Sequence, residues 1–314
     1  MGTVWIDSDM GFDDLAAVAM VVASGRAVAG LSLVAGNSPL PRVIANARAA
    51  AALFGWDFPL YGGACRPLIG PLITADYVLG DTGMPGGTAL PDAPPGPDLP
   101  RMLPALIRFA DNGGRDLLAL GPLTNIAAFA LARPDLARGM RLIWMGGAPG
   151  RGNHSAAAEF NAFVDPEAVQ LVIDAGVTIR MVGLDPCRQV TVGLADAQAL
   201  AARPGPHAPL LAGLLDGYCR IAADGQRPMA LYDPVAAAAL IAPDSVTFAP
   251  ARLDCETTGR LTRGMTVIEW RAHKAAPNAQ IATAADAPRI RALFMAGLAH
   301  AATGAAPAQK GPPA

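Results

Sequence analysis

The sequence predicts an α/β fold, in which an open and mostly parallel sheet carries helices on both faces. Short apolar runs alternate with helical segments along almost the whole chain, which is the pattern of repeated strand–helix units. Polar turns follow the predicted strands, and ligands bind at the carboxyl ends of strands in such sheets. The length of 314 residues and the 52% hydrophobic content suit one extensive core. We therefore expect a single domain over residues 1–303 and a disordered tail over 304–314.

The first predicted strand leads into the most acidic turn of the chain. A short apolar run beginning at Val4 is followed by four carboxylates within eight residues, and a helical apolar run, 15–23, follows directly. Carboxylates packed this closely repel one another unless a cation or hydrogen bonds compensate. An acidic, solvated turn would explain a single D-x-D. Two acidic pairs around Met-Gly favour a hard divalent cation instead; the four residues are Asp7, Asp9, Asp13 and Asp14.

The remaining elements follow in order from the spacing of apolar residues and turn formers. Strands are predicted at 30–37, 116–120, 141–147 and 177–184, and a β-hairpin at 253–268. Helices are predicted at 41–54, 100–110, from 126 onward, and at 209–223, 235–241 and 289–302. Residues 55–100 form a long irregular segment, which in a compact domain is often a lid or a binding loop.

Several polar residues after the strands have two possible roles. Asn37 is either a turn former or a site residue at a strand end. Thr124 or Asn125 would cap the next helix, or turn a backbone carbonyl toward a cation. Asp165 and Asp233 each precede a proline, so both are expected at helix starts. No local structure explains Glu159 and Asn161, which flank an aromatic residue.

The composition excludes several classes of protein. A net charge of −2 leaves no basic stripe for nucleic acid, and no apolar run reaches the roughly 18 residues of a membrane span. The chain starts directly with its first strand, without a leader, so we expect a cytoplasmic location. No G-x-G-x-x-G or P-loop motif occurs. The four cysteines lack C-x-x-C spacing and are expected to be free, buried thiols, and the four tryptophans are expected in the core.

Taken together, these motifs resemble the inosine-uridine-preferring nucleoside hydrolase family. Its N-terminal D-x-D-x-G-x-D-D pattern matches residues 7–14, with Met10 where proline is common. Further matches run in order to the C-terminal region: Val34–Asn37, Gly121–Asn125, Met145–Gly147, Gly152-Asn153, Glu159–Asn161, Asp165–Glu167, Asp233-Pro234, Glu256-Thr257 and Thr262–Gly264.

The resemblance implies a role for each matching residue. Asp9, Asp14, Asp233 and the main-chain carbonyl of Thr124 would bind Ca²⁺, and Asp9 would also accept a proton from the calcium-bound water. The ribose hydroxyls would be bound by Asp13, Asn153, Glu159 and Asn161, with Asn37 nearby; Met145 and Phe160 would pack against the sugar, and Asp7 would support the loop. It also implies a nucleoside substrate and a homodimer or homotetramer.

The chemistry of glycosidic cleavage fits these residue types. An oxocarbenium-like sugar needs negative charge around it, and the attacking water needs a cation and a base. No covalent nucleophile is indicated, so we expect direct attack by water with inversion.

The sequence departs from the family at the part of the site that holds the base. Many relatives carry histidine at the positions of Leu79 and Tyr232, where it helps the base to depart. None of the four histidines here matches either position; His154 lies next to Asn153 and is the one that could reach the pocket. Some purine-preferring relatives have an aromatic residue before the late aspartate, so Tyr232 favours purine nucleosides and is a candidate catalytic residue.

Three functions therefore remain open from the sequence. The first is a calcium-dependent nucleoside hydrolase. The second is a degenerate protein that binds ribose or nucleosides without turnover, because both histidines are absent. The third is a metal-dependent phosphatase, since D-x-D after a first strand also begins that chemistry. The phosphatase is disfavoured because both lysines, Lys274 and Lys310, lie near the C-terminus.

Overall fold

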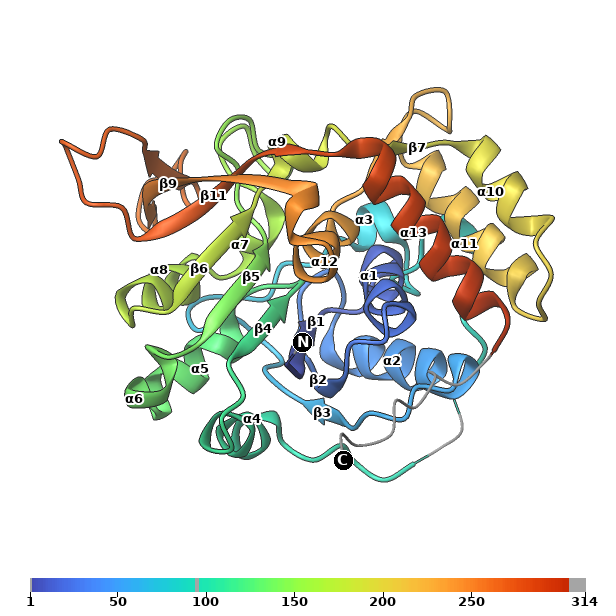
Figure 1. Cartoon of the computed structure of the whole chain (residues 1–314), viewed down its shortest axis with the longest axis horizontal. Coiled ribbons are helices and arrows are strands. Elements are labelled where there is room, and N and C mark those ends of the chain that lie inside the picture. Colours follow the sequence, from blue (N-terminus) through green and yellow to red (C-terminus); the bar gives the residue numbers. More distant parts are fainter. Residues whose placement is uncertain (1, 94–95, 305–314) are drawn as a thin grey trace.

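The protein is built around one nine-stranded sheet, seen here in a computed structural model that describes residues 2–93 and 96–304 (Figure 1). The six strands over residues 4–182 run parallel to one another, and the strand over 279–285 continues this parallel arrangement; the strand over 246–255 is antiparallel to both of its neighbours. In sheet order the strands are β10 (Thr266–Glu269), β9 (Val246–Cys255), β11 (Ala279–Ala285), β6 (Thr178–Val182), β5 (Arg141–Met145), β4 (Asp116–Ala119), β1 (Val4–Ser8), β2 (Val28–Leu33) and β3 (Leu60–Gly62). The predicted open, mostly parallel α/β fold is confirmed.

Helices cover both faces of this sheet (Figure 1). On one face α1 (Phe12–Ala23), α12 (Asp233–Ile241) and α13 (Ala287–Ala302) pack together, and on the other α4 (Met102–Asp111), α5 (Thr124–Ala132) and α8 (Pro166–Asp174) do so. A short ribbon of β7 (Thr191–Val192) and β8 (Met229–Ala230) joins the first group. The helices are α1 (Phe12–Ala23), α2 (Leu40–Phe54), α3 (Asp76–Leu79), η1 (Pro85–Gly87), α4 (Met102–Asp111), α5 (Thr124–Ala132), α6 (Pro134–Ala137), α7 (Phe160–Val164), α8 (Pro166–Asp174), α9 (Leu184–Cys187), α10 (Leu194–Ala201), α11 (Ala208–Arg220), α12 (Asp233–Ile241), η2 (Pro243–Ser245) and α13 (Ala287–Ala302).

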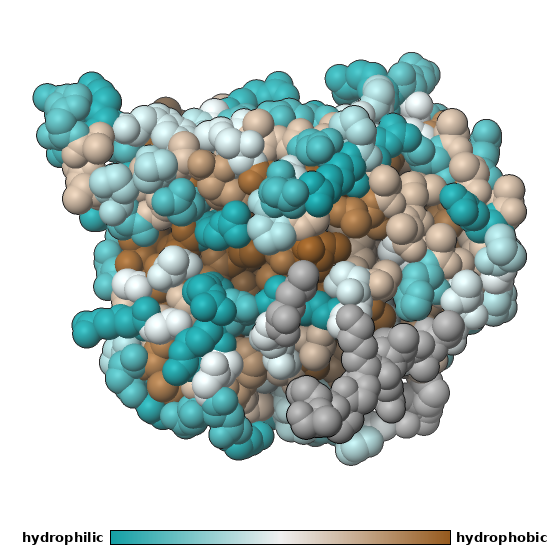
Figure 2. All heavy atoms as spheres, viewed as in Figure 1, coloured by the Kyte–Doolittle hydropathy of each residue, from teal (hydrophilic) through white to brown (hydrophobic). Residues whose placement is uncertain are grey.

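Alternating side chains of the central strands build two cores. In β1, Val4 and Ile6 belong to the core under α1 and α12, whereas Trp5 belongs to the core under α4 and α5. This follows from the two-residue period of a strand, since neighbouring side chains point to opposite faces. Figure 2 shows hydrophobic residues in a band across the middle of one face of the molecule, with hydrophilic residues along its margins.

The strand order places a crevice beside β1. The chain adds β2 and β3 on one side of β1 and β4, β5 and β6 on the other, so the order reverses there. Asp7 pairs with Ser32 of β2 and with Ala119 of β4, which puts the ends of all three strands at one level. In doubly wound sheets this reversal is where ligands bind, beyond the carboxyl ends of the strands. The acidic loop that follows β1 therefore lies at the carboxyl ends of the central strands, where a ligand is expected to bind.

Some local predictions were wrong. Leu123 is the N-cap of α5, so neither Thr124 nor Asn125 caps it. Trp270 is 45% exposed at the end of the β10 edge strand, while the other three tryptophans are buried. All four cysteines are free, but Cys65 is exposed. The predicted disordered tail lies, beyond Gly304, outside the described residues. Within the part of the chain that is described, no helix has the length and apolar character needed to cross a bilayer.

Candidate active site

The loop after β1 is held by hydrogen bonds to its own carboxylates. Ser8 Oγ and the Gly11 amide donate to the two oxygens of Asp14, at 2.6 and 2.9 Å. Met10 has φ of 52°, a left-handed conformation that is uncommon for residues other than glycine. Proline fixes φ at about −65° and would not fit this backbone. Methionine in place of the family's usual proline is therefore part of how this chain shapes the loop.

Asp9 and Asp7 are buried and held from neighbouring strands. The Asn37 backbone amide donates to Asp9 Oδ2 at 2.6 Å, which joins the turn after β2 to the turn after β1. Asp7 accepts hydrogen bonds from Ser32 and, at 2.7 Å, from Asn125 Nδ2. The loop-supporting role expected for Asp7 agrees with these contacts.

Three carboxylates converge closely enough to share one cation. Ligand oxygens of Asp13, Asp14 and Asp233 lie within 4.8 Å of one another. Asp13 and Asp14 are in the first turn of α1, while Asp233 begins α12. The sequence predicted Asp9 in this group and Asp13 on the ribose. Asp9 lies outside this group of three; burial raises its pKa, and the charges of the neighbouring Asp14 and Asp13 add to the effect.

The electrostatics of this cluster favour a bound cation. Burial raises the pKa of Asp13 to about 7, and the charge of Asp14 adds to the effect. Burial also raises the pKa of Asp9 and of Asp233 well above the usual range. Among the described residues, no lysine or arginine forms an ion pair with any of the four carboxylates. The donors are all oxygens, which suits a hard divalent cation.

Asp165 does more than cap a helix. Its Oδ1 accepts the Ala168 amide at 3.1 Å, as the predicted cap of α8 should. Its Oδ2 accepts Thr124 Oγ1 at 2.7 Å and the Leu68 amide at 2.9 Å. Asp165 thus fixes Thr124, whose carbonyl is a predicted metal ligand, and also the loop that leads to α3.

The Glu-Phe-Asn block forms the wall beside β5. Glu159 is the N-cap of α7 and accepts the amides of Asn161, Ala162 and Gly147 at 2.8 to 3.0 Å. Asn161 Nδ2 donates to the carbonyls of Leu120 and Met145, at 2.9 and 3.0 Å. Glu159 therefore does have a local structural role, which the sequence analysis missed. Burial raises its pKa to about 7.

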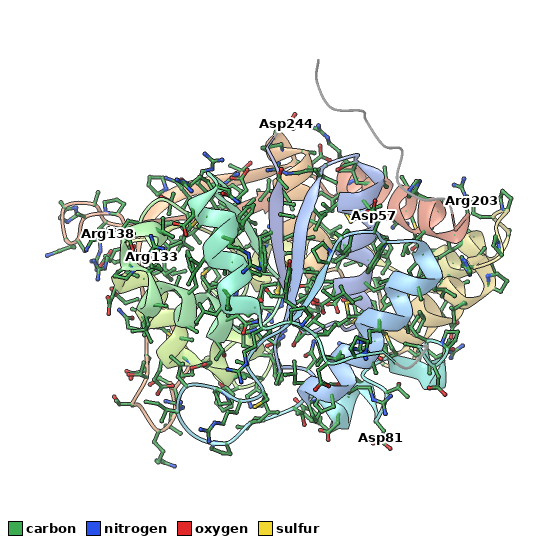
Figure 3. The ribbon with its side chains drawn as sticks, turned by 90° about the horizontal axis from the view of Figure 1, so that it is seen from below. Asp57, Asp81, Arg133, Arg138, Arg203 and Asp244 are labelled. Carbon is green, nitrogen blue, oxygen red and sulfur yellow. The ribbon has the colours of Figure 1, made fainter. Side chains whose placement is uncertain are left out.

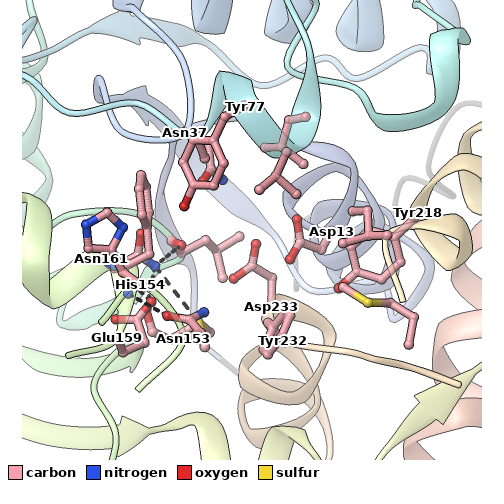
Figure 4. A pocket seen from close by; sticks show the side chains of 18 residues that line it. Asp13, Asn37, Tyr77, Asn153, His154, Glu159, Asn161, Tyr218, Tyr232 and Asp233 are labelled. Carbon is pink, nitrogen blue, oxygen red and sulfur yellow. Dashed lines mark hydrogen bonds between the residues drawn. The ribbon is translucent and has the colours of Figure 1, made fainter. Parts of the chain in front are cut away.

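These groups open into one cavity of about 260 Å³ (Figure 4). Of the residues predicted to bind substrate, all seven line it: Asp13, Asn37, Met145, Asn153, Glu159, Phe160 and Asn161. Asp233 and Tyr232 line it as well, whereas Asp9, Asp14 and Thr124 do not and are buried. The structure therefore brings the predicted sugar-binding residues together around one space.

The rest of the cavity is aromatic and apolar, and the sequence identified little of it. Tyr77 and Tyr218 line it, together with the half-buried ring of Tyr232 (Figure 4). The Tyr218 hydroxyl donates to the Ala230 carbonyl at 2.8 Å. Tyr218 sits on the buried side of α11, and its sequence context is that of an ordinary core residue. His154 also lines the cavity and packs against Phe160, as its position next to Asn153 allowed.

This fold and this site define a hydrolase of N-glycosidic bonds, and comparison with known proteins gives the family. The family model described as "Inosine-uridine preferring nucleoside hydrolase" matches residues 4–292, and the chain belongs to that family. The resemblance seen in the sequence is confirmed, and so is nucleoside hydrolase activity as the class of reaction.

The names of the relatives state different substrate preferences. The chain is 35% identical to the "Pyrimidine-specific ribonucleoside hydrolase RihA" of Enterobacter sp. over 84% of this chain and 87% of the relative. It is 37% identical to the protein of that name from Shewanella woodyi, over 84% and 87%. Among solved structures, "Purine-Preferring Ribonucleoside Hydrolase from Gardnerella vaginalis" superposes with a TM-score of 0.88 at 25% identity, covering 96% of this chain and all of that one.

Proposed function

We propose that this chain hydrolyses ribonucleosides to ribose and free base in a calcium-dependent reaction. The observation that carries the proposal is the convergence of Asp13, Asp14 and Asp233, of which Asp13 and Asp233 line the same cavity as the Glu159–Asn161 block. Calcium suits this site because the donors are oxygens and carry several negative charges. Its proposed ligands are Asp9, Asp14, Asp233 and the Thr124 carbonyl.

Each group of residues has a defined task in this proposal. When bound, calcium supplies positive charge that makes a water more acidic. Asp9 accepts a proton from the attacking water, since it neighbours Asp14 and has a raised pKa. The remaining carboxylates stabilise the positive charge that develops on the ribose ring. Because no covalent nucleophile is needed, we expect inversion at the anomeric carbon.

The ribose is held by residues on both sides of the cavity. Asp13 and Asn37 would bind hydroxyls from the β1 and β2 side, and Asn153, Glu159 and Asn161 from the β5 side. Met145 and Phe160 supply apolar contacts to the ring. Binding energy from these hydroxyls can be used to distort the sugar toward the transition state.

For the base, we propose a preference for purine nucleosides, supported by Tyr232. Its ring lines the cavity next to Asp233, and burial raises its pKa to about 12, so its hydroxyl stays protonated at neutral pH. Stacking of a base on an aromatic side chain contributes about 1–3 kcal/mol. A pyrimidine preference is the second candidate, because the relatives named RihA are pyrimidine-specific.

A substrate panel tests both levels of the proposal. Turnover of inosine, adenosine, uridine and cytidine is compared with that of p-nitrophenyl riboside, whose leaving group needs no acid. We expect Tyr232→Ala to reduce inosine turnover while sparing the activated riboside. Equal loss with both substrates would assign Tyr232 to the fold or the sugar and remove the support for purines. If the wild-type chain failed to cleave even the activated riboside, a non-catalytic nucleoside-binding role would replace the proposal.

The cytoplasmic location and the homodimeric or homotetrameric assembly expected from the sequence remain predictions, as does the single-domain organisation.

A further inference from the structure

We propose that a second cavity, at the amino-terminal ends of the central strands and so opposite the active site, binds a phosphate-class anion. This cavity has a volume of about 240 Å³. Its floor contains the first residues of three adjacent strands, Asp116, Arg141 and Thr178, which are in register with one another. The end of α12, at Leu240, forms another wall. We call it the arginine cavity, because Arg26, Arg141 and Arg180 line it.

The arginine cavity holds more positive than negative charge. Asp116 is its one carboxylate, and both of its oxygens are already used. Oδ2 accepts Arg26 Nη2 at 2.5 Å, and Oδ1 accepts Arg141 Nε at 2.6 Å. Arg180 has no carboxylate partner among the described residues, and its guanidinium lies 4.0 Å from the centre of the Phe248 ring. Three guanidinium groups therefore face a single carboxylate.

Neighbouring groups do not remove this excess. Asp244 follows Pro243 of the cavity wall, but its carboxylate is paired with Arg289 at 2.7 Å. The carbonyl end of α12 carries partial negative charge, and its Leu240 oxygen reaches Arg26 Nη1 only at 3.5 Å. The excess charge is thus left for a ligand to neutralise.

Arg26 provides an independent sign that a ligand belongs here. Its side chain is only 8% exposed, and its Nε is buried without a hydrogen-bond partner. Buried donors of this kind are normally satisfied by protein, water or an ion. The rest of the wall includes Leu142 and Ile143, which are apolar and strengthen electrostatic attraction to a bound anion. The excess of guanidinium charge points to an anion, and the unsatisfied donor belongs to a residue of the same cavity wall.

The chemistry favours phosphate over other anions. A guanidinium offers a planar fork of N–H donors that matches two oxygens of a phosphate group. A doubly charged oxyanion would balance the net excess of two positive charges that three arginines and one aspartate leave, and the cavity has room for a phosphate alone or as the ester of a small sugar.

The two cavities lie at opposite ends of the same strands. Figure 3 labels Asp244, beside the arginine cavity, and Asp81, close to the Leu79 that lines the catalytic one, at opposite ends of the molecule. Phosphate in the arginine cavity should therefore not compete with nucleoside.

Calorimetric titration of the full chain tests this proposal. Inorganic phosphate and ribose 5-phosphate are titrated separately in chloride buffer, with calcium held at one equivalent. The variants are Arg180→Gln, which removes the unpaired charge, and Arg138→Gln as a matched control. Arg138 is exposed, lies outside the cavity (Figure 3) and has no carboxylate partner in the described part of the chain. If Arg180→Gln fails to fold, Arg141→Gln replaces it, because the Arg141 side chain is 65% exposed.

We expect one saturable site per chain, affinity at least tenfold weaker in Arg180→Gln, and unchanged affinity in Arg138→Gln. Tighter binding of ribose 5-phosphate that persists with saturating nucleoside present would identify an ester as the ligand, and tighter binding of inorganic phosphate the free ion. Either result supports the site. Three results would overturn it: no saturable binding of either compound at millimolar concentration, equal effects of the two variants, or displacement of the phosphate by nucleoside.

Discussion

Glu159 gives the pH dependence that can be worked out most directly from the structure. The residue is 2% exposed, and its carboxylate accepts hydrogen bonds from three backbone amides. Burial opposes its ionisation and raises its pKa from 4.5 to about 7, although the amide donors partly offset this. The folded state therefore holds a proton on Glu159 that the unfolded chain releases at lower pH. The substitution Glu159→Gln keeps the shape of this side chain and removes its titration.

The sign and size of the effect follow from proton linkage. A raised carboxyl pKa means that the folded chain binds more protons than the unfolded one between pH 4.5 and about 7. Stability of the wild-type chain due to Glu159 is therefore greatest below that window and falls as the pH rises through it. At about 1.4 kcal/mol per pKa unit, the loss between pH 5 and 8 is roughly 2–3 kcal/mol. In the Glu159→Gln variant this contribution to the pH dependence of the free energy of unfolding is absent.

Urea unfolding of the wild type and of Glu159→Gln at pH 5 and pH 8, with calcium present, measures the difference in their free energies of unfolding. Glu159→Gln should be less stable at pH 5 by about 1–3 kcal/mol, because its amide places a donor against backbone donors. At pH 8 the difference in free energy of unfolding between wild type and variant should be smaller by roughly 2–3 kcal/mol than at pH 5. The aspartate cluster is present in both proteins, so its own titration cancels in the comparison. A gap that stays constant or widens with pH would refute the reasoning.

Three further outcomes test the metal cluster. Asp9→Asn should lower turnover by about 10²–10⁴-fold in a folded protein. Asp165→Asn should instead lose about 1–3 kcal/mol of stability, because its hydrogen bond from Thr124 is weakened. This variant should also need a higher calcium concentration for full activity, since the Thr124 carbonyl is a proposed ligand. Gly36→Ala should abolish activity, since the added Cβ would lie 2.2 Å from Asp9 Oδ2. The control Gly193→Ala should not change activity in the same assay, because an added Cβ there meets no atom within 4 Å. Dialysis against a chelator should stop turnover and lower the melting temperature, and added calcium should restore both; full activity without divalent metal would contradict the calcium proposal.

The fold and the acidic loop could be predicted because their determinants are local. Apolar runs, turn residues and the D-x-D-x-G-x-D-D pattern are all contiguous in sequence. Asp233 was harder, because its local pattern indicates only a helix start. Its carboxylate makes no cap and instead joins Asp13 and Asp14 from more than 200 positions away. Only the family resemblance indicated that partnership from the sequence.

The remainder depends on packing between distant elements. Tyr218 and Tyr77 enter the cavity from α11 and α3, and no periodicity of either segment marks them as site residues. The bond from Thr124 to Asp165 links two helix starts separated by 41 positions. Such contacts are determined by how layers stack, which hydrophobic patterning constrains only coarsely.

Helix α12 has a consequence for how this enzyme tolerates change. It begins at Asp233 in the catalytic cavity and packs against β4, β5, α1 and α13, and its residues 236–239 are four fully buried alanines. The methyl groups act as spacers that set the distance from the helix axis to the sheet, since close-packed interiors resist even one added methylene. A saturation mutational scan scored by turnover would thus reveal four consecutive intolerant positions in α12 that contact neither ribose nor metal. Larger residues there would be harmful because they shift the helix and, with it, the carboxylate of Asp233.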